Sequence, residues 1–418
     1  MLNGRDLVGG RQIAGRALGR VGARAGSSLA FGATLALLAR LTTLPEFGSF
    51  MLAYSIGLAT GIFAGIGAPT RVLRAGMDRQ PSPGALYVVH SALVGASGAI
   101  VGLAYCVLQP GPAVYAGLLL AFGDSLVNYT VSHMTADERH TVANLLLLSH
   151  RGLVLIVVGF EYVIVGRLNF LVLSIVLTLQ IVVALGIPMF FVSIRESLHR
   201  WRQPFNGGVG YWTYSMSALL GQLQIPVLAA VTSASVVASY SIAAKVVGPI
   251  SILTASVSVI AVPELVKRIR SPKRFNRLFH GLLGMAGIYL AVLVVLAWPI
   301  ARLVLWAAGS QYSAAEPIIV ATVIGAGISG CSQAFNSRLL ALGYPARSSM
   351  AITTGALAAL GLLAALGSGG LDTALWVVPV ATEVVVIVVI AVASCSVRQR
   401  SSEPAREPMY QLPFRGQT

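Results

Sequence analysis

The sequence predicts an all-α polytopic membrane protein of about twelve transmembrane helices, arranged as two six-helix bundles. Three observations predict this fold class. First, 56% of the 418 residues are hydrophobic and only 10% are charged, whereas a soluble domain carries roughly a quarter charged residues. Second, apolar runs recur along the chain at the length of a membrane-spanning helix, which needs about 20 apolar residues. Third, basic residues gather in every second connection between these runs, as the positive-inside rule requires.

Twelve predicted helices account for the apolar runs. In chain order they cover residues 18–41, 47–69, 84–108, 111–132, 142–165, 168–194, 209–231, 236–263, 278–307, 313–342, 346–367 and 371–396. The first has a short apolar part, Ala25 to Ala39, with Arg20 and Arg24 in its first turns. It resembles a signal peptide, but no small-residue cleavage site followed by a polar segment appears, so we predict a helix that stays in the membrane.

The positions of the basic residues predict the orientation. Twenty-three of the 29 Lys and Arg residues fall in the N-terminal segment, in the even-numbered connections and in the C-terminal tail. The odd-numbered connections hold only Arg40, Arg167 and Arg302. This asymmetry predicts an even number of spans with both termini in the cytoplasm. The net charge of +15 therefore comes mainly from the predicted cytoplasmic connections. We expect these connections to contact membrane lipids, and we expect no nucleic acid partner.

A weak internal repeat predicts the domain organisation. The segment from Leu38 to Thr43 aligns with the segment from Leu228 to Ser233, and both close one helix and open the next on the outer side. We therefore predict one six-helix bundle over residues 1–204, a second over residues 205–397, and a disordered cytoplasmic tail over residues 398–418. Repeated six-helix units are a transporter architecture, with the substrate site between the units near the middle of the membrane.

Three features of the sequence argue against enzymes and metal sites. The segment Gly325 to Gly330 spells GxGxxG, but the long apolar run and the lack of a following acid favour helix packing over dinucleotide binding. His133, Asp137, Glu138 and His140 have no metal-ligand spacing, so we predict a solvated inner loop and no metal. The outer connections are too short to carry catalytic groups, so we predict that the protein is not an enzyme.

Ionisable residues inside the apolar runs are the candidate functional residues, because each costs about 2.5–3.5 kcal/mol at the membrane centre and therefore faces a cavity or a partner. Asp124 and Arg151 fall at similar depth, and Lys245 falls near the midplane of the second half. Two interpretations stay open: a structural Asp124–Arg151 pair, or a cationic path drawing on both halves. Arg338 lies nearer the inner side and Arg40 nearer the outer side.

Two further polar positions belong to this set. Gln222 lies within the seventh predicted helix. Glu383 is a lone acid in the twelfth, either a coupling-ion carboxylate or a packed acid.

Two regions resemble a known family. The stretch from Leu37 to Phe50, LLARLTTLPEFGSF, resembles the first outer turn of Wzx-type polysaccharide flippases. These belong to the MOP superfamily, which also holds the MATE multidrug extruders. The segments Tyr211–Gln222 and Ala238–Lys245, with Val262–Leu265 after them, are similar to the start of the second half in the same family. Pro226 stands where the family often has an acid.

The resemblance implies a function and a site. It implies a V-shaped pair of bundles in the bacterial cytoplasmic membrane that flips a polyprenyl-pyrophosphate-linked oligosaccharide by alternating access, for polysaccharide biosynthesis. Arg40 and Lys245 fall on basic positions of the family, and the polar residues inside the apolar runs complete the set of expected substrate-binding residues: Arg40, Arg151, Lys245, Arg338 and Gln222. Asp124 and Glu383 are the expected coupling residues, with H⁺ or Na⁺ as coupling ion and no other cofactor. Glycosyltransferases or a glycan polymerase are the possible protein partners. The alternative is a cation-coupled exporter of the multidrug type, which would favour an acidic lumen.

Overall fold

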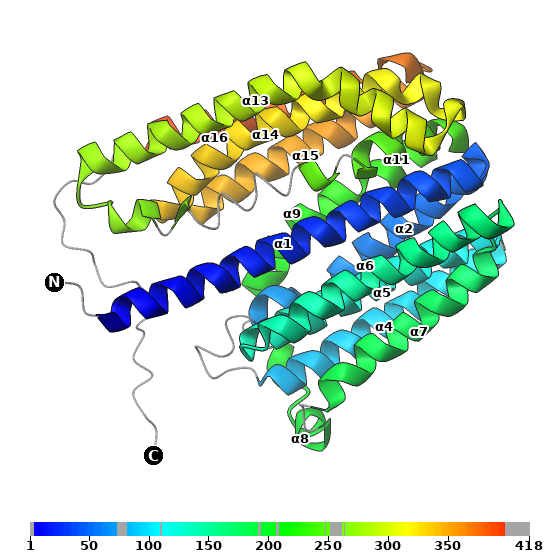
Figure 1. Cartoon of the computed structure of the whole chain (residues 1–418), viewed down its shortest axis with the longest axis horizontal. Helices are drawn as coiled ribbons and strands as arrows, with labels where there is room; N and C mark the ends of the chain where they lie inside the picture. The colour runs from blue at the N-terminus through cyan, green and yellow to red at the C-terminus, as the bar shows by residue number, and fades with distance from the viewer. Residues whose placement is uncertain are drawn as a thin grey trace.

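The computed structural model describes residues 4–72, 82–108, 111–190, 194–205, 209–246, 248–250, 261–262 and 264–397. Within these residues every regular element is helical (Figure 1), which confirms the predicted fold class. Ten helices in this part of the chain are long and apolar enough to cross a membrane. The predicted tail 398–418 and residues 251–260 of the eighth predicted helix lie outside the described residues.

Six long helices form the first half of the chain, and each corresponds to one predicted span. They are α1 (Gly4–Leu41), α2 (Leu44–Ala64), α4 (Pro83–Leu108), α5 (Pro112–Ala136), α6 (His140–Phe160) and α7 (Phe170–Met189). The start of α2 is fixed by a capping box, in which Glu46 Oε2 accepts the Thr43 N–H at 2.9 Å and Thr43 Oγ1 accepts the Glu46 N–H at 3.4 Å. Proline opens α4 and α5, where a missing N–H leaves no helical hydrogen bond unmade.

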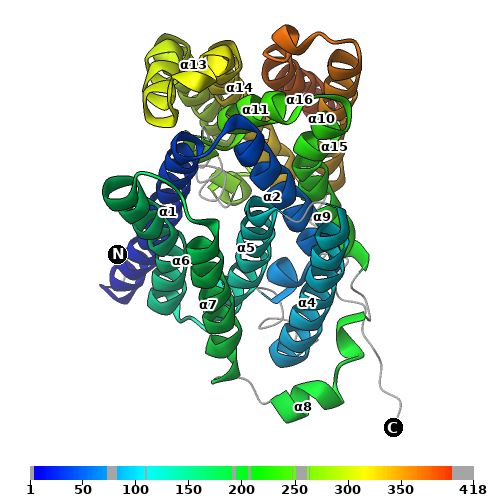
Figure 2. The ribbon, with the colours of Figure 1, turned by 90° about the vertical axis from the view of Figure 1, so that its right-hand side faces the viewer.

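The second half contains the remaining elements. They are α9 (Val209–Gln222), α10 (Gln224–Val231), α11 (Ala234–Val246), α13 (Pro272–Ala308), α14 (Glu316–Ala341), α15 (Pro345–Ser368) and α16 (Val377–Cys395), with the short turns η3 (Ser310–Ala315) and η4 (Asp372–Ala374). A short connection joins the halves through α8 (Ile194–His199) and η2 (Gln203–Phe205). Figure 2 shows α8 lying across the end of the first half where α7 finishes.

Three predicted helices differ most from the observed ones. The first begins at Gly4 and not at residue 18. The predicted span 209–231 is split at Leu223 into α9 and α10. Pro226 explains the break, because its ring excludes the carbonyl four residues earlier, at Gln222, where α9 ends. The fourth predicted helix ended at residue 132, whereas α5 continues to Ala136 and stops where Glu138 adopts a φ of +59°. His133 is consequently a buried helical residue rather than part of a solvated loop.

Small residues determine how α2 packs on α5. A Cβ at Gly57 would lie 2.7 Å from the Ala121 Cβ, and a Cβ at Gly61 would lie 2.3 Å from the Ser125 Oγ. Only glycine permits this approach of the two backbones, as in other membrane helix pairs. Gly57 and Gly61 thus form a packing surface on α2, and this contact sets the position of Asp124, the neighbour of Ser125 in α5.

The two halves meet at the end of the molecule that carries the last turn of α1. There the Gln311 amide donates to the carbonyl oxygens of Ala39 at 2.8 Å and Thr42 at 3.2 Å, and the Phe47 and Tyr312 rings pack edge to face. We call this contact the outer seam, after the non-cytoplasmic side to which the predicted orientation assigns it. From this end, α1 and the layer of α13 and α14 diverge toward the N-terminus (Figure 1).

Candidate functional site

A set of polar side chains lies within the membrane-spanning part of the first half. The Asp124 carboxylate of α5 accepts hydrogen bonds from the Tyr54 hydroxyl at 2.8 Å, from Arg151 Nη2 at 2.5 Å and, through its other oxygen, from His150 Nε2 at 2.8 Å. The Arg151 guanidinium also lies over the Phe31 ring, 3.7 Å from its centroid. Three helices besides α5 therefore hold one buried carboxylate and its partners.

The second half brings its own cation to the same place. The Lys245 Nζ of α11 donates to the Gln222 Oε1 of α9 at 2.8 Å and lies 5.9 Å from the centroid of the Tyr54 ring. Tyr54 thus connects the cations of the two halves, since its hydroxyl is within 3.5 Å of Arg151 Nη2 and its ring faces Lys245. We call Tyr54, Asp124, His150, Arg151, Gln222 and Lys245 the polar cluster.

The charges of the polar cluster do not cancel. Asp124 and Arg151 form an ion pair, so the structural pair left open by the sequence does form. Lys245 has no carboxylate within 4.0 Å among the described residues, and the amide oxygen of Gln222 only solvates it. Since Asp124 and Arg151 cancel, the Lys245 ammonium leaves these three residues with one net positive charge among the membrane-spanning helices.

Some buried polar atoms of the cluster lack partners. Arg151 Nη1 and His150 Nδ1 are buried and have no hydrogen-bond partner, and the same holds for Gln180 Oε1 of α7, whose amide nitrogen donates to the His150 carbonyl oxygen at 3.0 Å. Since buried polar atoms are normally paired, these atoms mark positions that a bound group, water or proton would satisfy. The cluster is therefore equipped to receive an anion at its cationic side.

Lys245 differs from the exposed Lys267 in its exposure and in its pairing with acidic side chains. The Lys267 Nζ is 2.7 Å from Glu264 Oε1, and Arg268 contacts the other oxygen of that carboxylate at 2.5 Å. The hydrogen bonds from Lys267 and Arg268 lower the pKa of the Glu264 carboxyl to about 2. Lys267 is thus paired and 70% exposed, whereas Lys245 is partly buried and has no carboxylate within 4.0 Å in the described part of the chain.

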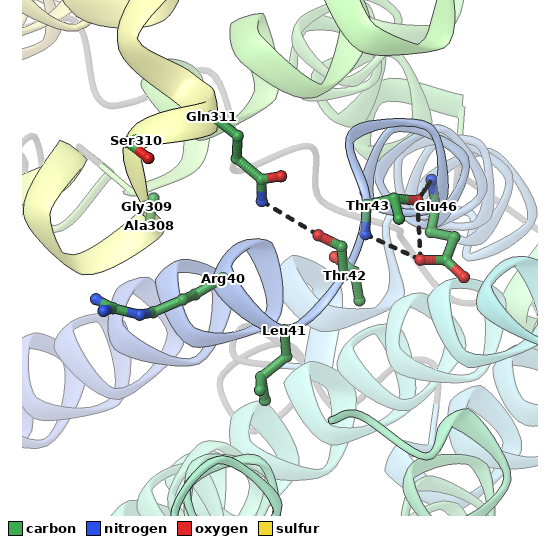
Figure 3. Close-up of a pocket in the computed structure, with 9 residues that line it drawn as sticks. All are labelled: Arg40, Leu41, Thr42, Thr43, Glu46, Ala308, Gly309, Ser310 and Gln311. Atoms are coloured by element: carbon green, nitrogen blue, oxygen red, sulfur yellow. Dashed lines mark hydrogen bonds between the residues drawn. The ribbon is translucent and has the colours of Figure 1, made fainter. Parts of the chain in front are cut away.

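Arg40 lies at the outer seam and not in the polar cluster. It lines a cavity of about 450 Å³ together with residues of both halves, among them Thr43, Glu46, Ser310 and Gln311. Figure 3 shows Gln311 reaching toward Thr42 while the Arg40 guanidinium points away from Glu46. Arg40 Nη1 donates to the Trp306 carbonyl oxygen at 2.9 Å, so in this conformation the side chain helps to hold α1 against α13.

Arg338 and Glu383 also lie outside the polar cluster. Arg338, in the last turn of α14, has its guanidinium 4.9 Å from the centroid of the Phe279 ring. Glu383 of α16 lines a separate cavity of about 190 Å³ within the second half, with Gln224, Tyr240 and Thr382. Of the seven predicted site residues, the structure brings together Asp124, Arg151, Gln222 and Lys245.

Sequence reasoning missed two members of the polar cluster. His150 precedes Arg151 within an apolar run, so it could have been singled out by the same argument that selected the charged residues. Tyr54 carries no such signal, because a tyrosine in a membrane helix most often packs as an aromatic side chain. No group of three or more His, Cys, Asp or Glu that could hold a metal ion occurs in the described part of the chain.

The comparisons with known proteins give a likeness of fold. No protein-family model and no curated protein sequence matches the chain. Among solved structures, it resembles a multidrug resistance MATE family transporter of the MOP superfamily in its inward-facing conformation, with a TM-score of 0.62 and 13% identity, covering 90% of this chain and 96% of that chain. It also resembles a MOP superfamily transporter from Pyrococcus furiosus, with a TM-score of 0.59 and 11% identity over 91% of this chain and 94% of that one.

A third structure extends the same result. The bent form of a MATE transporter from Vibrio cholerae gives a TM-score of 0.54 at 17% identity, covering 92% of this chain and 98% of that chain. Each similarity spans nearly the whole of both chains, so the arrangement of all the helices is shared. The chain is a multi-pass membrane protein with the fold of MATE and MOP superfamily transporters.

Proposed function

We propose that this protein is a transporter that flips a polyprenyl-pyrophosphate-linked oligosaccharide across the bacterial cytoplasmic membrane by alternating access. One observation carries the proposal: Lys245, a cation of the second half, lies against Tyr54, the residue that also contacts Arg151 of the first half, and has no carboxylate within 4.0 Å among the described residues. A charged group at this depth is costly. An anionic headgroup that enters the polar cluster would supply the missing counter-charge.

The position of the cluster suits a lipid-linked substrate. Its residues come from α2, α5 and α6 on one side and from α9 and α11 on the other, so the site lies between the halves. The pyrophosphate would bind there while the polyprenyl tail remains in the bilayer between the two bundles. Such a substrate would be made by glycosyltransferases on the cytoplasmic side and used by a glycan polymerase on the other, which makes these enzymes the proposed partners.

The conformation supports an alternating-access cycle. The outer seam is closed by the bonds of Gln311 and Arg40 and by the contact of Phe47 with Tyr312. A structure described as inward-facing is among those with the same fold. Opening of the outer seam would expose the polar cluster to the other side, and the contacts that must break are a few hydrogen bonds and one aromatic pair.

A second candidate function is a cation-coupled exporter of the multidrug type. The observation that favours it is the cavity around Glu383, which holds an acid that a cation could neutralise. Two of the solved transporters with this fold carry the multidrug resistance or MATE description. We rank this function second, because the residues that link the halves carry net positive charge, which repels organic cations.

The two functions are distinguished by the charge of the substrate that crosses. In proteoliposomes, we expect a fluorescent polyprenyl-pyrophosphate-linked saccharide to be flipped at least about tenfold faster than the same saccharide on an uncharged polyprenyl ether, because only the former has a counter-charge for Lys245. Ethidium should not be transported. Ethidium transport without flipping of the pyrophosphate lipid would instead establish the exporter.

A further inference from the structure

His150 has a geometry that makes it the proton-binding group of the polar cluster. The inference rests on the proposed function, because it concerns what happens when an anionic headgroup enters. His150 is 4% exposed and contacts Asp124 at 2.8 Å through Nε2. An ionised carboxylate brings no hydrogen of its own, so Nε2 must carry the shared hydrogen. In the neutral ring, Nδ1 is then a bare acceptor.

The surroundings of Nδ1 are ready for a second proton. Nδ1 has no partner, and neither has Gln180 Oε1, an acceptor on the side chain whose nitrogen contacts the His150 backbone. Two acceptors cannot bond to each other, but a protonated Nδ1 becomes a donor. Protonation would therefore make Nδ1 a donor that can bond a nearby acceptor, such as water or the amide oxygen of Gln180, while Nε2 keeps its bond to Asp124.

Asp124 is a poorer acceptor for the proton than His150. Its two oxygens already accept from Tyr54, Arg151 and His150, so a proton on the carboxylate would have to displace one of these donors and would break the ion pair with Arg151. A proton at His150 Nδ1 leaves all three hydrogen bonds in place. The buried pair thus directs the incoming proton to the histidine.

The charges around His150 decide when the proton binds. The charges are those of Asp124 in α5, Arg151 in α6 and Lys245 in α11. Tyr54 of α2 and Gln180 of α7 are neutral polar groups, and α1 contributes the apolar Phe31 ring. A proton on His150 raises the net charge of the cluster from one to two positive charges. An anion beside Lys245 and Arg151 makes this second charge more favourable, and by reciprocity the second charge strengthens anion binding.

We propose that His150 takes up one proton from water when the anionic headgroup binds and releases it when the headgroup leaves. One N–H bond forms at Nδ1, the headgroup keeps its bonds, and no other reactant is needed. The protein then carries one proton together with each headgroup, so the charge moved across the membrane is one unit less negative than that of the headgroup alone.

The number of protons taken up on binding tests this proposal. Calorimetric titration of the purified protein with farnesyl pyrophosphate near pH 7.5, in buffers of different ionisation enthalpy, measures it directly. We expect net uptake approaching one proton for the wild type and none for His150→Gln. The ligand cannot supply this signal, because cations favour its deprotonated form and would make it release protons. The matched control is His133→Gln, another buried histidine of the first half, which should behave as the wild type.

The outcomes separate this inference from the proposed function. Farnesyl pyrophosphate that fails to bind the wild type would overturn the proposed function and this inference with it. Binding without proton uptake, or uptake that persists in His150→Gln, would overturn only the role of His150. If His150→Gln does not fold, Gln180→Leu removes the acceptor for the protonated ring and should reduce uptake, and unchanged uptake in that variant would contradict the proposal.

Discussion

At the scale of single residues, the polar cluster is held together by one acid, Asp124, that accepts hydrogen bonds from several donors. Asp124 holds Arg151 in place through a 2.5 Å contact, and Tyr54 and His150 complete its coordination. Removing one member of such a buried pair leaves an uncompensated charge, whereas removing both leaves none. The pair therefore positions Arg151 beside Lys245 without contributing net charge of its own.

This arrangement predicts a strongly non-additive pair of substitutions. Asp124→Asn should lower the stability of the protein in detergent by about 3–5 kcal/mol, because Arg151 stays buried and unpaired. Adding Arg151→Gln to Asp124→Asn should restore part of that loss. Thermal unfolding of both single variants and of the double variant measures the coupling, and losses that simply add would show that the pair is not formed.

The residues of this cluster were only partly predictable from the sequence. Depth along an apolar run is enough to place Asp124 beside Arg151, because both must avoid lipid at the same level of the membrane. Depth does not say which way a helix is turned, so Arg40 and Arg338 were grouped with Lys245 although they lie at the outer seam and in the last turn of α14. His150 was overlooked because it carries no fixed charge.

At the scale of the helices, length and apolar character decide most of the fold. Most long apolar runs form a helix within a few residues of the predicted ends, because a helix pairs its backbone groups within one segment, as a membrane requires. The first helix begins earlier than predicted, at Gly4 instead of residue 18. The other exceptions are local. Pro226 splits the seventh span into α9 and α10, and α5 runs on past residue 132 until Glu138. Pro226 and Glu138 can both be read from the sequence, but a hydropathy average over a long window does not respond to a single residue.

The contact of α2 with α5 predicts a substitution and its rescue. Gly61→Ala should destabilise the protein by about 1–3 kcal/mol, because the new Cβ would lie 2.3 Å from Ser125 Oγ. Ser125→Gly removes the clashing atoms, so the double variant should recover most of the lost stability in thermal unfolding. Gly102→Ala, where a Cβ meets nothing within 4 Å, is the control and should be neutral or slightly stabilising. If the double variant is no more stable than Gly61→Ala, the close contact between Gly61 and Ser125 would be contradicted.

At the scale of the whole molecule, the two halves meet at one cluster and one seam, and the proposed function depends on both contacts. The sequence predicts the number of spans, their orientation and the repeat, since these follow from composition and charge along the chain. Which intramembrane charges meet depends on how the helices pack, and no single periodicity contains that information. The structure supplies it by placing Lys245 of the second half and Arg151 of the first against the same residue, Tyr54.

The most direct measurement compares two lysines in the same flipping assay. Lys245→Gln and Lys267→Gln each remove one positive charge, but Lys245 faces Tyr54 in the polar cluster and Lys267 pairs with Glu264 at the surface. With equal amounts of folded protein in proteoliposomes, the account predicts that Lys245→Gln lowers the flipping rate of the pyrophosphate-linked saccharide at least about tenfold and that Lys267→Gln leaves it nearly unchanged. Wild-type flipping by Lys245→Gln would contradict the central claim that this lysine binds the headgroup.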